Sequence, residues 1–142
     1  MQDNHSTVVV ARSISPLTQT NDSTAIVGEI VDHAGYDSAE YIIQYGAMTD
    51  ADMTLVTLLE EGDTATLTDN TAVADADMQG TEAGATPLFS NDNKNFKLGY
   101  TGTKRYTRLT ITPTNNNSGD LPVAAVCVLG RARLDPHATQ MS

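Results

Sequence analysis

Short segments that alternate apolar and polar residues, each bounded by turn residues, recur along this chain of 142 residues. Side chains in a strand point to opposite faces in turn, so such alternation builds one apolar face. Two segments show the pattern best, and their one-sided residues are Tyr41, Ile43 and Tyr45 in 40–45 and Phe96, Leu98 and Tyr100 in 95–100. No long stretch has the spacing of an amphipathic helix, so the pattern favours an all-β chain.

The same reading predicts about eight strands in an antiparallel β-sandwich or jelly-roll-like barrel. Segment 52–61 fits a helix or a strand, and we take the strand. The clearest expected strands are 7–12, 25–32, 40–45, 52–61, 95–100, 104–112 and 121–130, with short strands and loops over 63–93. We expect Pro16 to break the segment that follows the first strand, and Gly102 to form the tight turn of a hairpin. Segment 121–130 is apolar on both sides, which indicates a central strand covered on both faces.

One domain spanning 1–142 suits this length, with polar arms at 1–6 and 135–142 that we expect to be mobile in isolation. The longest apolar run, 123–129, is far shorter than the roughly 20 residues of a membrane span. Residues 1–11 lack the pattern of an export signal. Cys127 is the only cysteine, so it can form no disulfide within the chain. We therefore expect neither a membrane-spanning role nor disulfide stabilisation.

Charge is distributed unevenly along the sequence. Residues 1–92 have a net charge of −15, and residues 93–142 have a net charge of +5, which together give −10. A surface this acidic argues against general binding to nucleic acid, which depends on neutralising phosphates. The two halves could instead pair within one molecule or between identical neighbours, and both arrangements predict sensitivity to salt.

Catalytic and cofactor motifs are lacking in the sequence, so we predict that the chain is not an enzyme and needs no cofactor. Cys127 lies in the most apolar segment, which is typical of a buried, inert thiol. The three histidines are too dispersed to predict a metal or catalytic site. The pairs Asp50/Asp52 and Asp75/Asp77 favour solvated acidic loops over calcium ligands, and a metal-assisted hydrolase using those four aspartates is the weakest alternative.

Segment 94–108 interleaves basic and aromatic residues. Such a pattern could stack on single-stranded nucleic acid, but the acidic remainder of the chain would repel a polyanion. We favour an amphipathic hairpin whose cations pair with acids on an adjacent strand or subunit. The predicted interaction surface, which includes the basic exit of the last strand, consists of Lys94, Lys97, Lys104, Arg105, Tyr106, Arg108, Arg131 and Arg133.

Four segments carry a resemblance to a known group of proteins. They are LLEEGD at 58–63, TLTD at 66–69, DMQGT at 77–81 and KLGYTGTKRYTRLTIT at 97–112. In this order they resemble small proteins encoded among the head genes of tailed bacteriophages, and the similarity extends over roughly residues 25–135. The resemblance implies a virion structural component, most plausibly a capsid decoration or cement protein, and supplies no catalytic residues.

Such a protein would sit on the outer surface of the capsid, bind the major capsid protein and assemble with itself, typically as a trimer. The implied site is the basic surface defined above, with no nucleic acid or membrane as partner. The alternative is a receptor- or carbohydrate-binding module of a head fibre or tail tip. That role needs exposed aromatic rings, for which Tyr36, Tyr41 and Tyr45 are the candidates outside the hairpin.

Overall fold

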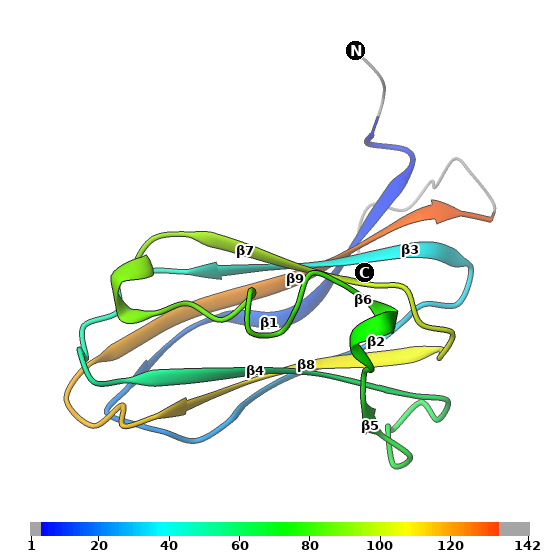
Figure 1. The fold of residues 1–142 in the computed structure, drawn as a ribbon. Helices are drawn as coiled ribbons and strands as arrows, with labels where there is room; N and C mark the ends of the chain where they lie inside the picture. Colours follow the sequence, from blue (N-terminus) through cyan, green and yellow to red (C-terminus); the bar gives the residue numbers. More distant parts are fainter. Residues whose placement is uncertain (1–3, 134–142) are drawn as a thin grey trace.

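The computed structural model describes residues 4–133, which form two antiparallel β-sheets packed face to face (Figure 1). The described strands are β1 (Val8–Thr20), β2 (Ile26–Asp32), β3 (Tyr36–Tyr45), β4 (Thr54–Gly62), β5 (Thr71–Ala72), β6 (Met78–Gln79), β7 (Asn95–Tyr100), β8 (Tyr106–Thr114) and β9 (Asp120–Ala132). Within 4–133 the only helical elements are two 3-10 turns, η1 (Asp75–Asp77) and η2 (Phe89–Asn91). The all-β prediction is confirmed.

The order of strands is that of a jelly roll. One sheet has the order β1-β9-β3-β7-β6 and the other β2-β8-β4-β5, so the chain crosses repeatedly between the two layers. Leaving out the two-residue β6, each sheet contributes four strands, as in the double-sheet jelly roll. The sandwich predicted from short alternating strands is therefore present, and the topology selects the jelly-roll form.

The core lies between the two sheets, as the alternation predicts. Tyr41, Ile43 and Tyr45 on β3 are at most 1% exposed, and the alternate residues of that strand face outward. On β8, Leu109 and Ile111 are fully buried against them from the opposite layer. The segment that fits either a helix or a strand forms β4, with Leu55 and Leu59 buried and Val56 exposed.

The first strand does not stop at residue 12, and Pro16 does not break the extended chain that follows, contrary to prediction. Strand β1 continues to Thr20, and its register against β9 shifts between Ile14 and Leu17, where Pro16 lies. β1 is an edge strand, so a residue without an N–H can be accommodated at a bulge without losing a ladder hydrogen bond inside the sheet.

The prediction of a hairpin around Gly102 is also wrong. β7 pairs with β3 and β6 in the five-stranded sheet, whereas β8 pairs with β2 and β4 in the other sheet. The intervening loop therefore crosses from one layer to the other. Local turn chemistry cannot distinguish this crossing from a hairpin, because both need the same short, glycine-containing connection.

Strand β9 occupies a central position, between β1 and β3, as its apolar sequence predicts. Its inward side chains are buried, but those at 122, 124, 126 and 128 remain partly exposed on the outer face. Within residues 4–133, β9 is therefore covered by other parts of the chain on its inner face only, and not on both faces as predicted. The consequence of this uncovered face is developed below.

Gly28 explains the imperfect alternation in the second strand. A Cβ at this position would lie 2.6 Å from the carbonyl oxygen of Leu109, too close for any other residue. The register against β8 shifts here, between Val27 and Ile30. The glycine thus permits a bulge where the backbones of β2 and β8 approach each other.

The polar stretch at 63–93 contains the short strands and loops that were expected, namely β5, β6, η1 and η2. The predicted arms fall mostly outside the described residues, which begin at Asn4 and end at Arg133. Between these limits, the structure contains no helix long and apolar enough to cross a bilayer.

Candidate functional site

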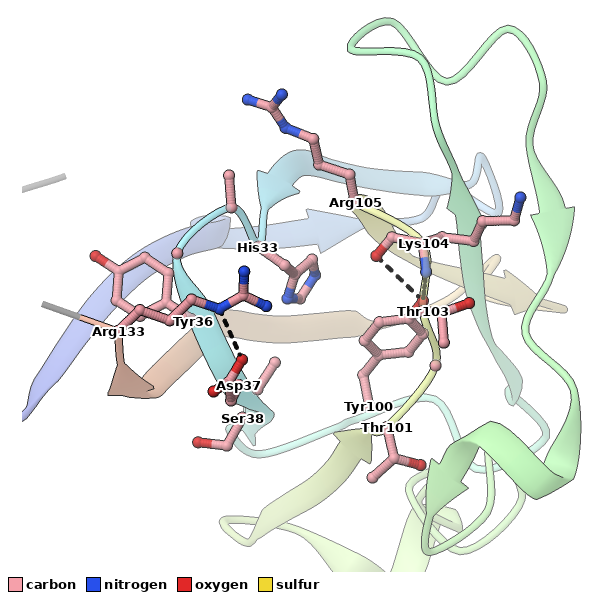
Figure 2. Close-up of a pocket in the computed structure, with 14 residues that line it drawn as sticks. His33, Tyr36, Asp37, Ser38, Tyr100, Thr101, Thr103, Lys104, Arg105 and Arg133 are labelled. Carbon is pink, nitrogen blue, oxygen red and sulfur yellow. Dashed lines mark hydrogen bonds and ion pairs between the residues drawn. The ribbon is translucent and has the colours of Figure 1, made fainter.

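A groove of about 480 Å³ with charged residues in its walls lies at one end of the sandwich (Figure 2). Its walls are the turn from β2 to β3, the loop that crosses from β7 to β8, and the end of β9. The loop carries Lys104 and Arg105, the turn carries His33, and Arg133 follows β9. The jelly-roll crossings bring these three segments, distant in sequence, to the same end of the molecule.

A buried hydrogen-bond chain lies behind His33. Its Nε2 lies 2.6 Å from the hydroxyl of Thr107, which lies 2.6 Å from the hydroxyl of Tyr41. Burial lowers the pKa of His33 to about 4, so the imidazole is neutral at neutral pH. A neutral Nε2 can accept from Thr107 while Thr107 accepts from Tyr41, so one arrangement of protons satisfies all three groups.

Tyr100 fixes the crossing loop. Its hydroxyl donates to Glu61 on β4 at 2.6 Å and accepts from the backbone N–H of Lys104 at 2.9 Å. Burial, together with the Glu61 carboxylate, raises the pKa of Tyr100 above its ordinary value, so the phenol remains a donor. Its ring also lies 5.1 Å from the ring of His33. These contacts make the wall of the groove a rigid part of the fold.

The cations at this end are paired with acids of the same chain. Lys104 contacts Asp63 at 2.5 Å, Arg133 contacts Asp37 at 3.1 Å, and Arg105 makes a two-pronged contact with Asp32. Each pair joins a cation from residues 93–142 to an acid from residues 1–92. The uneven charge distribution of the sequence is thus resolved, at these positions, by pairing within one molecule.

The predicted interaction residues do not form one surface. Four of them lie at the groove end of the sandwich, namely Lys104, Arg105, Arg131 and Arg133. Tyr106 follows Arg105, whose guanidinium carbon lies 5.0 Å from the centroid of the Tyr106 ring. Lys97 and Arg108 lie on the outer faces of opposite sheets, and Arg108 contacts Glu60 at 2.9 Å. Lys94 lies at the other end, where its carbonyl accepts from the Tyr45 N–H.

Arg131 has a backbone conformation that most side chains avoid. Its φ is 52°, in the left-handed region, which costs a residue with a Cβ about 1 kcal/mol. The side chain is exposed and makes no salt bridge with any residue in 4–133. Among the four cations at the groove end, it is the one without a salt bridge to the described residues.

A second groove, of about 580 Å³, lies at the opposite end of the five-stranded sheet. Its walls include the amide side chains of Gln44, Asn93 and Asn95 and the rings of Pro16 and Pro122. None of its lining residues is charged, although 18% of the whole sequence is. No sequence pattern predicts this groove, because its walls come from β1, β3, β7, β9 and loop residues that only the tertiary structure brings together.

The aromatic rings considered for glycan stacking are mostly in the core. Tyr41 is fully buried and Tyr45 is 1% exposed, so neither offers a face to a sugar. Tyr36 alone among the three is partly exposed, at the first groove. This outcome removes two of the three aromatic residues that would favour a carbohydrate-binding role.

The two aspartate pairs lie in local structure of the loops: Asp50 is buried and hydrogen-bonded, and Asp75 and Asp77 lie in a 3-10 turn. Asp50 is 2% exposed and accepts hydrogen bonds from the backbone of Asn117 and Ser118, at 3.0 and 2.9 Å. Hydrogen bonding, first from Asp52 and then from Ser118, lowers the pKa of Asp50 to about 2. Asp75 and Asp77 form η1, and residues 4–133 contain no cluster of three or more metal-ligating side chains.

Cys127 is fully buried in β9, and burial raises the pKa of its thiol to about 12. A thiol in this state has almost no thiolate at neutral pH and so lacks the reactive form of a nucleophile.

No known protein family and no curated protein matches this chain. Among solved structures, it is similar to the CBM36-1 domain of a multidomain xylanase from the hindgut metagenome of Trinervitermes trinervoides. The identity is 10% and the TM-score 0.45, covering 89% of this chain and 99% of that domain. It is also similar to the CBM22-1–GH10 modules of xylanase 10B from Clostridium thermocellum, complexed with xylohexaose.

The second similarity has 9% identity and a TM-score of 0.42, and covers 96% of this chain but only 28% of that structure. At such identities and TM-scores, neither structure assigns a function to this chain.

Proposed function

We propose that this chain is a virion structural protein of a tailed bacteriophage, a capsid decoration protein that binds the outer capsid lattice and stabilises the head. It acts by adhesion to proteins and not by catalysis. The jelly roll is a fold used by capsid and lectin domains alike, so the fold is compatible with this role and does not decide it.

The observation that carries the proposal is the position of segment 97–112, where the resemblance to phage head proteins is concentrated. This segment forms β7, the crossing loop and β8, and so links the two sheets. Its loop presents Lys104 and Arg105 in the groove at the end of the sandwich where β9, which carries Arg131, also ends. We assign the capsid contact to this end, where an acidic lattice surface would meet Arg131 without first breaking an ion pair to any residue in 4–133.

Capsid binding tests this assignment. The purified chain is mixed with capsids of the phage that encodes it, and bound copies per particle are counted by mass spectrometry. We expect Arg131→Glu to lower occupancy at least about tenfold, because reversed charge opposes an acidic surface. Lys94→Glu is the matched control, since this exposed cation at the other end also lacks a salt bridge within 4–133. Absence of wild-type binding, or equal loss in both variants, would contradict the proposal.

The uncharged groove at the opposite end supports a second candidate function, carbohydrate binding. The amides of Gln44, Asn93 and Asn95 can donate to and accept from sugar hydroxyls, and the proline rings give an apolar wall. Calorimetric titration with xylohexaose and a screen on a glycan array test this function. Binding that Gln44→Ala abolishes and Arg131→Glu leaves intact would establish it, and absence of any glycan signal would exclude it.

A further inference from the structure

The outer face of the five-stranded sheet is apolar along its middle. The outward side chains of β9 are Pro122, Ala124, Val126 and Val128, and each is partly exposed. Ile42 of β3 pairs with Val126 in the sheet and is 38% exposed. A contiguous apolar surface of this kind on a sheet commonly marks a site of association.

The charged residues around this apolar stripe balance one another. Register and alternation place four charged side chains at outward positions of the paired strands, namely Arg12, Lys97, Glu40 and Asp120. Two are cations and two are acids, and Arg12 is further paired with Glu29 of β2 at 3.3 Å, so the face is close to neutral in a molecule whose net charge is −10. Two copies of this face can approach without the repulsion that their other surfaces would impose.

We propose that this outer face packs against the same face of a second copy of the chain, related by a two-fold axis. The inference deepens the proposed structural role, on which it rests, by naming the surface of self-assembly, and it replaces the trimer that the resemblance implies with a two-fold pair. Sheets stack face to face at about 10 Å, with their side chains interdigitating across the interface. The second copy supplies the outer coverage that the apolar sequence of β9 predicts and that residues 4–133 of one molecule do not provide.

The composition of the face favours a second copy over other occupants. In an arrangement with two-fold symmetry each face meets its own pattern, and a face that carries both signs of charge can complement itself. The outward positions named above include no aromatic ring on which a sugar could stack, and because Pro122 and Ala124 also line the uncharged groove, pairing of this face would cover part of that groove. A strongly charged protein partner would find no net opposite charge here.

Light scattering after gel filtration, across a wide range of protein concentrations, tests the proposal. We expect wild type to approach twice the chain mass of 15.1 kDa, or a larger even multiple. Ile42→Lys should weaken the pairing by about a hundredfold, because the symmetry would bury two lysines in one apolar interface. Val56→Lys is the matched control, since Val56 is 60% exposed on the outer face of the other sheet, and it should leave the mass unchanged.

Circular dichroism confirms that each variant is folded before its mass is interpreted, and Val126→Thr, which keeps β-branching, is a milder second variant.

A monomer at all concentrations, a trimer, or dissociation by Val56→Lys with Ile42→Lys unaffected would overturn the proposal. Loss of glycan or capsid binding in Ile42→Lys, with wild type monomeric, would assign the face to that other partner and also overturn it. If the chain dimerises but does not bind capsids, the proposed function is wrong and the dimer stands. If the chain binds capsids as a monomer, the dimer is wrong and the proposed function stands.

Discussion

Replacing Thr107 by valine removes the central hydroxyl of the buried chain that joins His33 to Tyr41, while preserving the shape and β-branching of the residue. Thr107 is fully buried, and its Oγ1 lies 2.6 Å from both His33 Nε2 and the Tyr41 hydroxyl. The variant therefore leaves two polar groups without their partner. The unpaired Tyr41 hydroxyl should cost more free energy of folding than the unpaired His33 nitrogen, because Tyr41 is 0% exposed and no water can reach its hydroxyl.

The magnitude follows from these positions. A buried polar group that loses its partner costs about 1–3 kcal/mol, and the half-buried imidazole costs less than the phenol. We therefore expect Thr107→Val to lower the free energy of unfolding by about 2–4 kcal/mol. Thr107→Ser keeps the hydroxyl and loses one methyl group, which should cost about 1 kcal/mol.

Urea denaturation followed by circular dichroism measures both variants, and an unchanged m-value shows that the comparison concerns stability alone. Tyr41→Phe should cost less in the Thr107→Val background than in wild type, because the hydroxyl it removes is already unpaired. A coupling of about 1–2 kcal/mol between the two substitutions is expected. A Thr107→Val variant as stable as Thr107→Ser, or additive costs in the double mutant, would refute the reasoning.

Two further predictions follow from the same structure. Because burial lowers the pKa of His33 to about 4, the unfolded chain binds more protons between this value and about 6.5. Stability should therefore fall by up to about 3 kcal/mol as pH falls through this range, and urea titrations at several pH values should show a smaller fall in His33→Gln. Gly28→Ala would place its Cβ 2.6 Å from the Leu109 carbonyl and should destabilise the fold by about 2–4 kcal/mol. Gly35→Ala, at a φ of 89° with no neighbour within 4 Å, should cost about 1 kcal/mol when both variants are measured by urea denaturation, and equal costs would contradict the steric reason.

The elements themselves were predictable because their signals are local. Alternation on β3, β7 and β8 predicted the buried residues, including Tyr41 and Leu109, since a strand has only two faces and one must be apolar. The position of Cys127 in an apolar segment likewise predicted its burial. The strand at Pro16 was cut short because proline ends most strands, and only the edge position of β1 shows why it is tolerated here.

The candidate site was predictable only in part. The cations Lys104, Arg105 and Arg133 were expected to pair with acids, but which acids, and whether they belong to the same molecule, depended on the approach of distant segments. The uncharged groove gave no sequence signal, because its amides and prolines belong to separate strands and loops that meet only in the tertiary structure. Lys97 and Arg108, close in sequence, lie on opposite sheets because the connection after β7 crosses the sandwich.

The sequence by itself determined that the chain forms short strands around one apolar core, because side-chain alternation and turn residues act over a few positions. The tertiary structure decided which strands pair, that β7 and β8 lie in different sheets, and that the outer face of β9 is left uncovered. The physical reason is that strand pairing depends on contacts between segments far apart in the chain. Their hydrogen bonds are the same for any pair of strands, so partners are chosen by how the whole core packs.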